Sequence, residues 1–258
     1  MYKTSLTDEQ WQVVERFFNK TIGKVNSGRP IKTSYRVILD AILYVVVTGV
    51  QWRMLPNDFP PKGTVYYHFS KWKDDGTFKK VNDELSKFYR LKCEKNENPS
   101  LGIIDSQSSK ATENAETSGY DGNKKIKGRK RQIIVDTLGN IIDINVHDAN
   151  IHDSKGASLF LKSLKKLPFQ LIKIIGDKGY RGEIKNEFLN ILNIEFETSC
   201  KEKSNNGFIV HSKRWIVERT FAWFGKFRRL CRDYETLNSS VVSFCYLAMI
   251  KLLINRLA

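Results

Sequence analysis

The segment Leu101-Gly102-Ile103-Ile104-Asp105 is an apolar run of strand length that ends on a carboxylate. Two further strands are predicted downstream, at Gln132–Asp136 and Ile141–His147, because the intervening Thr-Leu-Gly-Asn is typical of a hairpin turn. Leu171–Gly176 repeats the first pattern, since it is a buried apolar run followed directly by Asp177. This half of the chain is therefore expected to form strands, two of which end on acidic residues.

Helical patterns alternate with the later strands. Helices are predicted from about Asp153 to Leu164 and over Glu183–Leu192, Arg214–Arg229 and Ser239–Leu257, and Ile194–Thr198 is a fifth strand candidate. Three antiparallel strands followed by alternating helices and parallel strands form the RNase H-like order. The expected fold is therefore α/β, with an RNase H-like mixed sheet covered by helices.

The first part of the chain is predicted to be entirely helical. The helices begin near Leu6, Ser34, Thr64 and Gly76. Short helices with tight turns and basic polar faces resemble a helix-turn-helix module, although a plain helical dimerisation domain would show the same pattern. The polar stretch Lys92–Ser100 is the predicted linker. We therefore expect a small helical DNA-binding domain over residues 1–95 and a sheet domain over residues 96–258.

The charge of the chain favours a polyanionic partner. Its 43 lysines and arginines outnumber 28 acidic residues, which gives a net charge of +15 and a sequence pI of about 9.6. Nucleic acid is the usual partner of such a chain, and a merely lysine-rich soluble surface is the alternative. The four cysteines are too far apart in sequence for a zinc ribbon. The start has no signal-peptide pattern and Val241–Ile254 is too short to span a bilayer, so a cytosolic protein is expected.

Three carboxylates stand in apolar surroundings: Asp105, Asp177 and Glu218. Taken singly, each aspartate has a simple alternative as a turn cap, and Glu218 as the ion-pair partner of Arg214. Together they favour a divalent-metal site, because an unpaired buried carboxylate is costly and Mg²⁺ prefers oxygen ligands. The histidines and aspartates around His147 and Asp153 offer a competing cluster, for which helix capping is the better interpretation.

Basic residues cluster in two places that flank the predicted acidic site. One run, Lys124–Arg131, carries six positive charges in eight residues and leads into the second strand; the other surrounds Glu218 on its predicted helix. Each is usually a solvated face, but beside a metal site both are predicted to bind phosphates. The predicted DNA contacts are Lys124, Lys125, Lys127, Arg129, Lys130, Arg131, Arg214, Arg219, Lys226, Arg228 and Arg229.

The chain resembles bacterial insertion-sequence transposases of the DDE class, insertion-sequence group five. The likeness is carried, in family order, by SLTDEQW, GRPIK, AILYVVVTGVQWRMLPNDFPPKGTVYYHFSKWKDDG, IIDSQS, GYDGNKKIKGRKRQIIVDTLGNI, GDKGYRG and RWIVERTFAWFGKFRRLCRDYE. Arg214 and Glu218 match the family signature around its glutamate. His211 stands at the signature's tyrosine, and Gly225 at its lysine with Lys226 one residue later. Gln132, where relatives often have histidine, is given no role.

The resemblance implies an RNase H-like catalytic domain in which Asp105, Asp177 and Glu218 bind Mg²⁺, with Mn²⁺ as a substitute. It implies double-stranded DNA as the partner, both as element ends and as target, and a homodimer or larger assembly on that DNA. Neither a membrane nor a small-molecule substrate is expected, and the bacterial cytoplasm, at the nucleoid, is the expected location. Two rival hypotheses are a non-catalytic DNA-binding protein and an RNase H-like nuclease without strand transfer.

Overall fold

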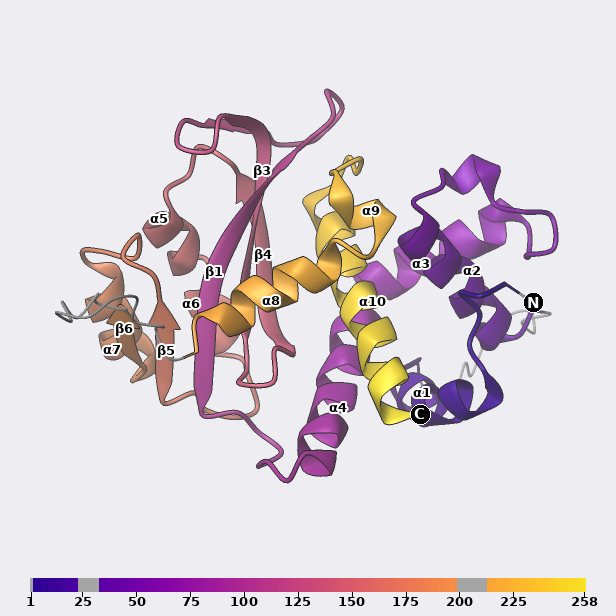
Figure 1. The fold of residues 1–258 in the computed structure, drawn as a ribbon, viewed down its shortest axis with the longest axis horizontal. Coiled ribbons are helices and arrows are strands. Elements are labelled where there is room, and N and C mark those ends of the chain that lie inside the picture. Colours follow the sequence, from indigo (N-terminus) through magenta and orange to yellow (C-terminus); the bar gives the residue numbers. More distant parts are fainter. Residues whose placement is uncertain (1, 23–32, 199–212) are drawn as a thin grey trace, which may run out of the picture. The chain divides into compact units, whose positions relative to one another are not determined.

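The computed structural model describes residues 2–22, 33–198 and 213–258, which form two compact units (Figure 1). The helical unit consists of Met1–Lys95, Phe224–Arg232 and Ser239–Ala258. The sheet unit consists of Asn96–Trp223 and Asp233–Asn238. The division after residue 95 coincides with the predicted domain boundary. The carboxyl-terminal helices, however, were assigned to the second domain from sequence and belong by packing to the helical unit.

The helical unit contains the four predicted helices. Its elements are α1 (Asp8–Ile22), α2 (Tyr35–Thr48), the 3-10 turn η1 (Trp52–Met54), α3 (Lys62–Asp74), α4 (Thr77–Lys92), α9 (Arg228–Cys231) and α10 (Asn238–Leu257). The Ser34 hydroxyl accepts a hydrogen bond from the Arg36 N–H and caps α2, which ends at Gly49 with φ +73°. Helix α3 starts at Lys62, two residues before the predicted Thr64, since Pro61 occupies its cap position.

Helix α10 is the core helix of the helical unit. By length and composition alone it is apolar enough to cross a membrane, but 78% of its most apolar window is buried inside the protein. Phe244 of α10 stacks on Phe69 of α3 with ring centroids 4.9 Å apart. A helix that is apolar on all sides is stabilised by burial, so α10 suits the centre of the helical unit.

The sheet unit is a mixed α/β layer with the predicted RNase H-like order. Its strands are β1 (Leu101–Lys110), β2 (Gly119–Asp121), β3 (Ile126–Val135), β4 (Ile141–Asp148), β5 (Lys173–Gly176) and β6 (Glu195–Thr198). Their order is β4-β3-β1-β5-β6, with β2 paired to the first residues of β3. Strands β3 and β4 run antiparallel to their neighbours, and β5 and β6 run parallel to β1. The predicted fold class is confirmed.

Several boundaries differ from the sequence prediction. Strand β1 continues five residues beyond Asp105, and β3 begins at Ile126, because the two strands pair from Ile103–Val135 to Lys110–Gly128. Most of the basic run is therefore strand rather than loop. Strand β2 was not predicted. The helix expected over Arg214–Arg229 is two helices, interrupted at Gly225-Lys226.

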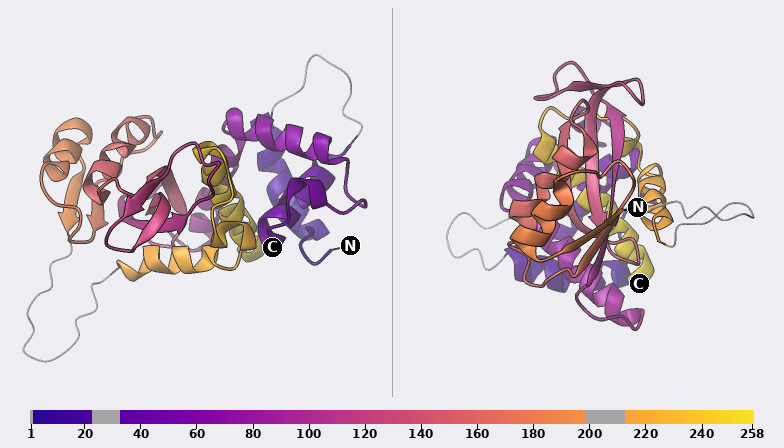
Figure 2. Two further views of the ribbon diagram at one scale, coloured as in Figure 1. Left: turned by 90° about the horizontal axis from the view of Figure 1, so that it is seen from above. Right: turned by 90° about the vertical axis from the view of Figure 1, so that its left-hand side faces the viewer.

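The two faces of the sheet carry different helices. Helices α5 (Asp153–Ser158), α6 (Phe160–Leu164) and α7 (Ile184–Leu192) cover one face, and α8 (Trp215–Phe224) crosses the other (Figure 2). Successive side chains of a strand alternate between the faces. The hydrophobic core therefore joins Ile104 and Ile134 of the strands to Phe160 and Phe188 of the helices, on the α5–α7 face.

Helix α5 approaches the sheet unusually closely. A Cβ atom at Gly156 would lie 2.4 Å from His147 Nε2 and 2.6 Å from Gln132 Oε1, so only glycine allows this contact. The close approach brings the first residues of α5, Asp153 and Ser154, to the edge of the sheet at which the two aspartates lie.

Candidate active site

Asp105 and Asp177 lie at the same level of two neighbouring strands. Strands β1 and β5 run parallel with Ile103 opposite Ile175, and each aspartate follows its paired isoleucine by two residues. Asp177 directly follows the carboxyl end of β5, whereas Asp105 lies in the middle of β1, so the prediction that Asp105 ends its strand is wrong. The Asp105 carboxylate accepts a hydrogen bond from the Ser106 N–H at 2.7 Å, and Asp177 accepts one from the Gly179 N–H at 2.8 Å. The strand register thus brings together two of the three predicted acids.

The environment of Asp105 disfavours its charged form. Burial raises the pKa of Asp105 to about 6; the Ser106 N–H opposes the rise, the charge of Asp177 adds to it, and Lys124 and Arg214 oppose it. Asp105 and Asp177 lie near enough to repel one another, and a bound divalent cation would relieve that repulsion. Both residues supply only hard oxygen donors, so the donor chemistry fits Mg²⁺.

Glu218 lies on α8, half-exposed, and is paired with Arg214. The Arg214 guanidinium donates to Glu218 Oε1 at 2.6 and 3.1 Å. Partial burial lowers the pKa of Arg214, but the hydrogen bond and charge of Glu218, with the charges of Asp105 and Asp177, outweigh it and raise the pKa. Arg214 is thus the cation shared by the three acids. An ion pair this exposed is worth about 1 kcal/mol or less, so it does not hold Glu218 firmly.

The three acids do not form a closed metal cage. Across the residues that the structure describes, no three Asp, Glu, His or Cys side chains lie close enough to hold a metal ion. The two aspartates fit a divalent ion by position and chemistry, while Glu218 remains engaged with Arg214. The assignment of all three as ligands therefore stays a prediction.

We expect the metal-free protein to lose stability as pH rises through the titration of Asp105. Because the folded pKa, about 6, lies above the value near 3.9 expected for an unfolded aspartate, the contribution is fully present below pH ~4 and lost by pH ~6.5. Asp105→Asn removes the cost of ionising this carboxyl in the folded protein. The free energy of unfolding of the variant should therefore rise relative to wild type across that pH window, by up to about 3 kcal/mol. Urea unfolding in EDTA at pH 4.5 and 7.5 measures the gain; equal gains at both pH values would contradict the assigned environment.

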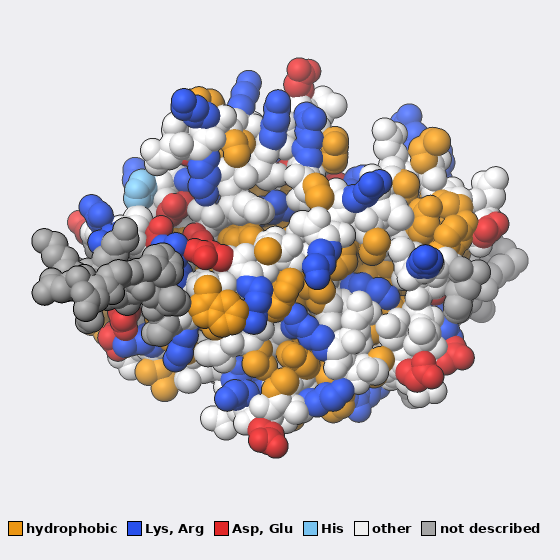
Figure 3. Space-filling model, viewed as in Figure 1, with side chains coloured by type: hydrophobic (Ala, Val, Ile, Leu, Met, Phe, Trp, Pro, Cys, Tyr) orange, Lys and Arg blue, Asp and Glu red, His pale blue; other side chains and the backbone are white. Residues whose placement is uncertain are grey.

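Only part of the first basic run faces solvent. Lys124, Lys125 and Lys127 are exposed, and the Lys124 ammonium donates to the Ser106 carbonyl at 3.2 Å, next to Asp105. Figure 3 shows Lys and Arg side chains gathered over the outer ends of β1 and β3, with acidic side chains beside them. These three lysines remain predicted phosphate contacts.

Three predicted DNA contacts in the same run have side chains that are buried in the sheet unit; their contact with DNA stays a prediction. Arg129 is fully buried and forms a two-pronged ion pair with Asp233. The Lys130 ammonium donates to Asp153 Oδ1 at 3.0 Å, and Arg131 donates to Gln107. The long β1–β3 ladder turns these side chains inward, toward internal acceptors.

The basic residues around Glu218 also divide by burial. Arg219 lies over the rings of Trp215 and Trp223 and donates to the Leu138 carbonyl. Lys226 and Arg228 are exposed and remain predicted contacts. Arg229 is buried in the helical unit, where it donates to the Val50 carbonyl; its contact with DNA stays a prediction. His211 lies outside the described residues.

A buried polar network beside the aspartates was missed from sequence. Asp153 was interpreted as a helix cap, but His152 holds the cap position and the Asp153 carboxylate accepts from Ser106 Oγ at 2.8 Å. Gln132 Nε2 donates to the Asp153 carbonyl and to the Tyr180 hydroxyl, both at 2.9 Å. The sequence offered no alternating pattern to reveal it, because the polar residues of β1 and β3 follow one another without interruption after Asp105 and before Ile133.

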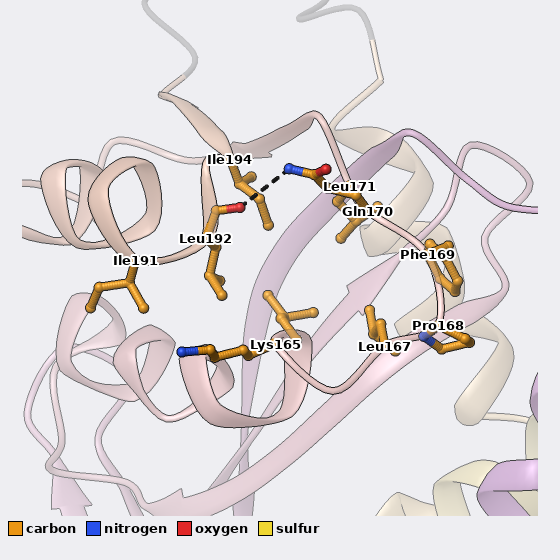
Figure 4. Close-up of a pocket in the computed structure, with 10 residues that line it drawn as sticks. Lys165, Leu167, Pro168, Phe169, Gln170, Leu171, Ile191, Leu192 and Ile194 are labelled. Atoms are coloured by element: carbon orange, nitrogen blue, oxygen red, sulfur yellow. Dashed lines mark hydrogen bonds between the residues drawn. The ribbon is translucent and has the colours of Figure 1, made fainter.

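Two pockets of the sheet unit differ in chemistry. One, of about 350 Å³, lies between the α6–β5 connection and the end of α7, and Figure 4 shows the apolar side chains of Leu167, Ile191, Leu192 and Ile194 around it. It contains no carboxylate. The other, of about 280 Å³, lies beside the loop that follows Asp177, and most of its lining residues, Ser154 among them, are polar or charged.

Strand order and paired aspartates define the class, an RNase H-like catalytic domain preceded by a helical region. Two known protein families match the chain and agree with this class. "Transposase DDE domain" matches residues 96–253, and "Putative transposase of IS4/5 family" matches residues 6–82. The chain belongs to the insertion-sequence DDE transposase family. It is 30% identical over 115 residues to "Putative transposase for insertion sequence element IS402" of Burkholderia cepacia, covering 42% of this chain and 54% of that relative.

The chain spans about half the length of this curated relative. The family is one of transposases, which typically use divalent metal ions.

Proposed function

We propose that the chain binds the inverted-repeat ends of its own insertion sequence, cleaves them by two-metal phosphoryl transfer and joins the 3′-hydroxyl ends to target DNA. The observation that carries the proposal is the register of β1 and β5, because it sets Asp105 and Asp177 level at adjoining strands. Glu218 would complete the ligand set from α8. Mg²⁺ bound there, or Mn²⁺ in its place, would activate the attacking oxygen and neutralise the leaving one.

The chain's own residues prepare this site for DNA. A carboxyl must be ionised to act as a metal ligand, and with a pKa of about 6, which Lys124 and Arg214 keep from rising further, Asp105 is ionised at neutral pH. The ion pair between Arg214 and Glu218 is exposed and weak, so a DNA phosphate would replace Glu218 as the partner of Arg214. The exposed Lys124, Lys125 and Lys127 would bind backbone phosphates beside the site, which adds affinity without reading sequence.

Joining two element ends requires them to be held together. A homodimer or larger assembly on double-stranded DNA is therefore part of the proposal, as are DNA binding by the helical unit and action at the nucleoid in the bacterial cytoplasm.

The decisive experiment uses a supercoiled donor plasmid that carries the element with its native flanks. With Mg²⁺ the purified protein should release the element ends and yield joined products in a target plasmid. Cleavage without joined products would instead favour a nuclease without strand transfer. End binding with neither reaction, in Mg²⁺ or Mn²⁺, would favour a non-catalytic DNA-binding protein and would overturn the proposal.

A further inference from the structure

We propose that Asp153 and Ser154, at the start of α5, are positioning residues that tie the β1 and β5 aspartates to one another. Neither residue belongs to the predicted acidic triad. The inference rests on the proposed function, because it concerns the geometry of the site formed by Asp105 and Asp177.

Asp153 holds the β1 side. Its Oδ1 accepts a hydrogen bond from Ser106 Oγ at 2.8 Å, and Ser106 is the residue whose N–H binds the Asp105 carboxylate. The same oxygen accepts from the Lys130 ammonium at 3.0 Å. The Lys130 side chain is only 9% exposed, so its charge balances Asp153 at a nearly dry position. Asp153 is therefore connected to Asp105 through a single residue.

Ser154 holds the β5 side. Its hydroxyl donates to the Gly179 carbonyl at 2.9 Å and accepts from the Arg181 N–H at 3.1 Å. Gly179 is the residue whose N–H binds the Asp177 carboxylate. One hydroxyl thus bonds two backbone groups of the loop that follows Asp177. Adjacent residues of one helix in this way contact the β1 residue after Asp105 and the loop after Asp177.

The two residues are themselves fixed to the sheet. Gln132 Nε2, on β3, donates to the Asp153 carbonyl and to the buried Tyr180 hydroxyl. Gly156 lets α5 lie against Gln132 and His147 with no space for a Cβ atom. Helix α5 is therefore a rigid connection between the strands rather than a loose cover, which is what a positioning role requires.

Outer residues that orient metal ligands typically change metal affinity or activity by 10–100-fold when they are replaced. Ser154→Ala removes both loop contacts and leaves the carboxylates intact. In the full-length protein we expect about tenfold weaker Mn²⁺ binding by calorimetry, and a similar rise in the Mg²⁺ concentration for half-maximal cleavage. Affinity for element-end DNA should stay unchanged. Ser154→Thr keeps the hydroxyl and should restore both metal readouts.

The matched control is Ser158→Ala on the same helix, whose hydroxyl donates to Glu187 at 2.8 Å and contacts neither aspartate loop. A purely structural role would lower the thermal stability of both alanine variants alike. Asp153→Asn, which keeps the shape but not the charge, tests the β1 side by the same titrations. If Ser154→Ala and Asp153→Asn bind Mn²⁺ as tightly as Ser158→Ala does, the positioning role is overturned.

The Asp177→Asn variant distinguishes a wrong positioning role of Asp153 and Ser154 from a wrong proposed function. If it loses Mn²⁺ binding while the Ser154 and Asp153 variants do not, only the positioning role fails. If Asp177→Asn also binds Mn²⁺ normally, the metal site itself is wrong.

Discussion

Asp105→Asn should abolish Mg²⁺-dependent cleavage at the element ends while leaving end binding nearly intact. The substitution keeps the size of the side chain and removes one oxygen ligand and the negative charge. Metal ions contribute several kcal/mol to phosphoryl transfer, so the expected loss is on the order of 10³-fold or more. Cleavage of a labelled element-end duplex at saturating protein measures it, and a mobility-shift titration of the same duplex measures binding.

The same substitution separates chemistry from folding. Asp105 is buried with a raised pKa, so its replacement should leave the metal-free protein at least as stable as wild type at neutral pH. If the Asp105→Asn protein is inactive but unfolds at a higher urea concentration than wild type, it has lost a catalytic group rather than its fold. Asp148→Asn, at the end of β4, is the matched control and should cleave normally. Wild-type cleavage by Asp105→Asn in Mg²⁺ would remove Asp105 from the site.

The sequence was sufficient to predict the central strands and to predict that Asp105 and Asp177 lie near one another. Apolar runs such as Ile103-Ile104 and Ile133-Ile134 bury both faces, and burial of that kind leaves a clear local signal. The level positions of Asp105 and Asp177 follow from parallel pairing, which the strand order implies. Glu218 is different, because its distance from the aspartates depends on where α8 crosses the sheet, and no local pattern encodes that.

The basic run shows why local reasoning failed elsewhere. A cluster of lysines and arginines predicts a solvated loop, because charged side chains are rarely buried unless they are paired. Arg129 has such a partner in Asp233, but the two residues are 104 positions apart in sequence. Likewise, Asp153 follows the pattern of a helix cap, and only the docking of α5 on the sheet turns its carboxylate toward Ser106 and Lys130.

Arg129→Met should destabilise the sheet unit by about 3–5 kcal/mol, because it leaves Asp233 buried without its countercharge. Arg129 is 0% exposed and donates to both oxygens of Asp233, at 2.6 and 2.7 Å. Its remaining donors bind the carbonyls of Glu235 and Thr236 and the side chain of Asn238. Replacement thus removes the side-chain contacts that hold the 233–238 segment to β3. Urea unfolding, followed by far-UV circular dichroism, measures the loss.

Lys127→Met is the matched control, because Lys127 precedes Arg129 by two residues on the same strand but is exposed. Its free energy of unfolding should stay within about 0.5 kcal/mol of wild type. Its DNA affinity should fall instead, with a salt dependence shallower by about 0.9 in log–log slope, the value for one lost phosphate contact. The double variant Arg129→Met/Asp233→Leu should recover stability, since it removes the stranded charge. If Arg129→Met unfolds like wild type but binds DNA more weakly, the Arg129 guanidinium contacts DNA and the buried ion pair with Asp233 is contradicted.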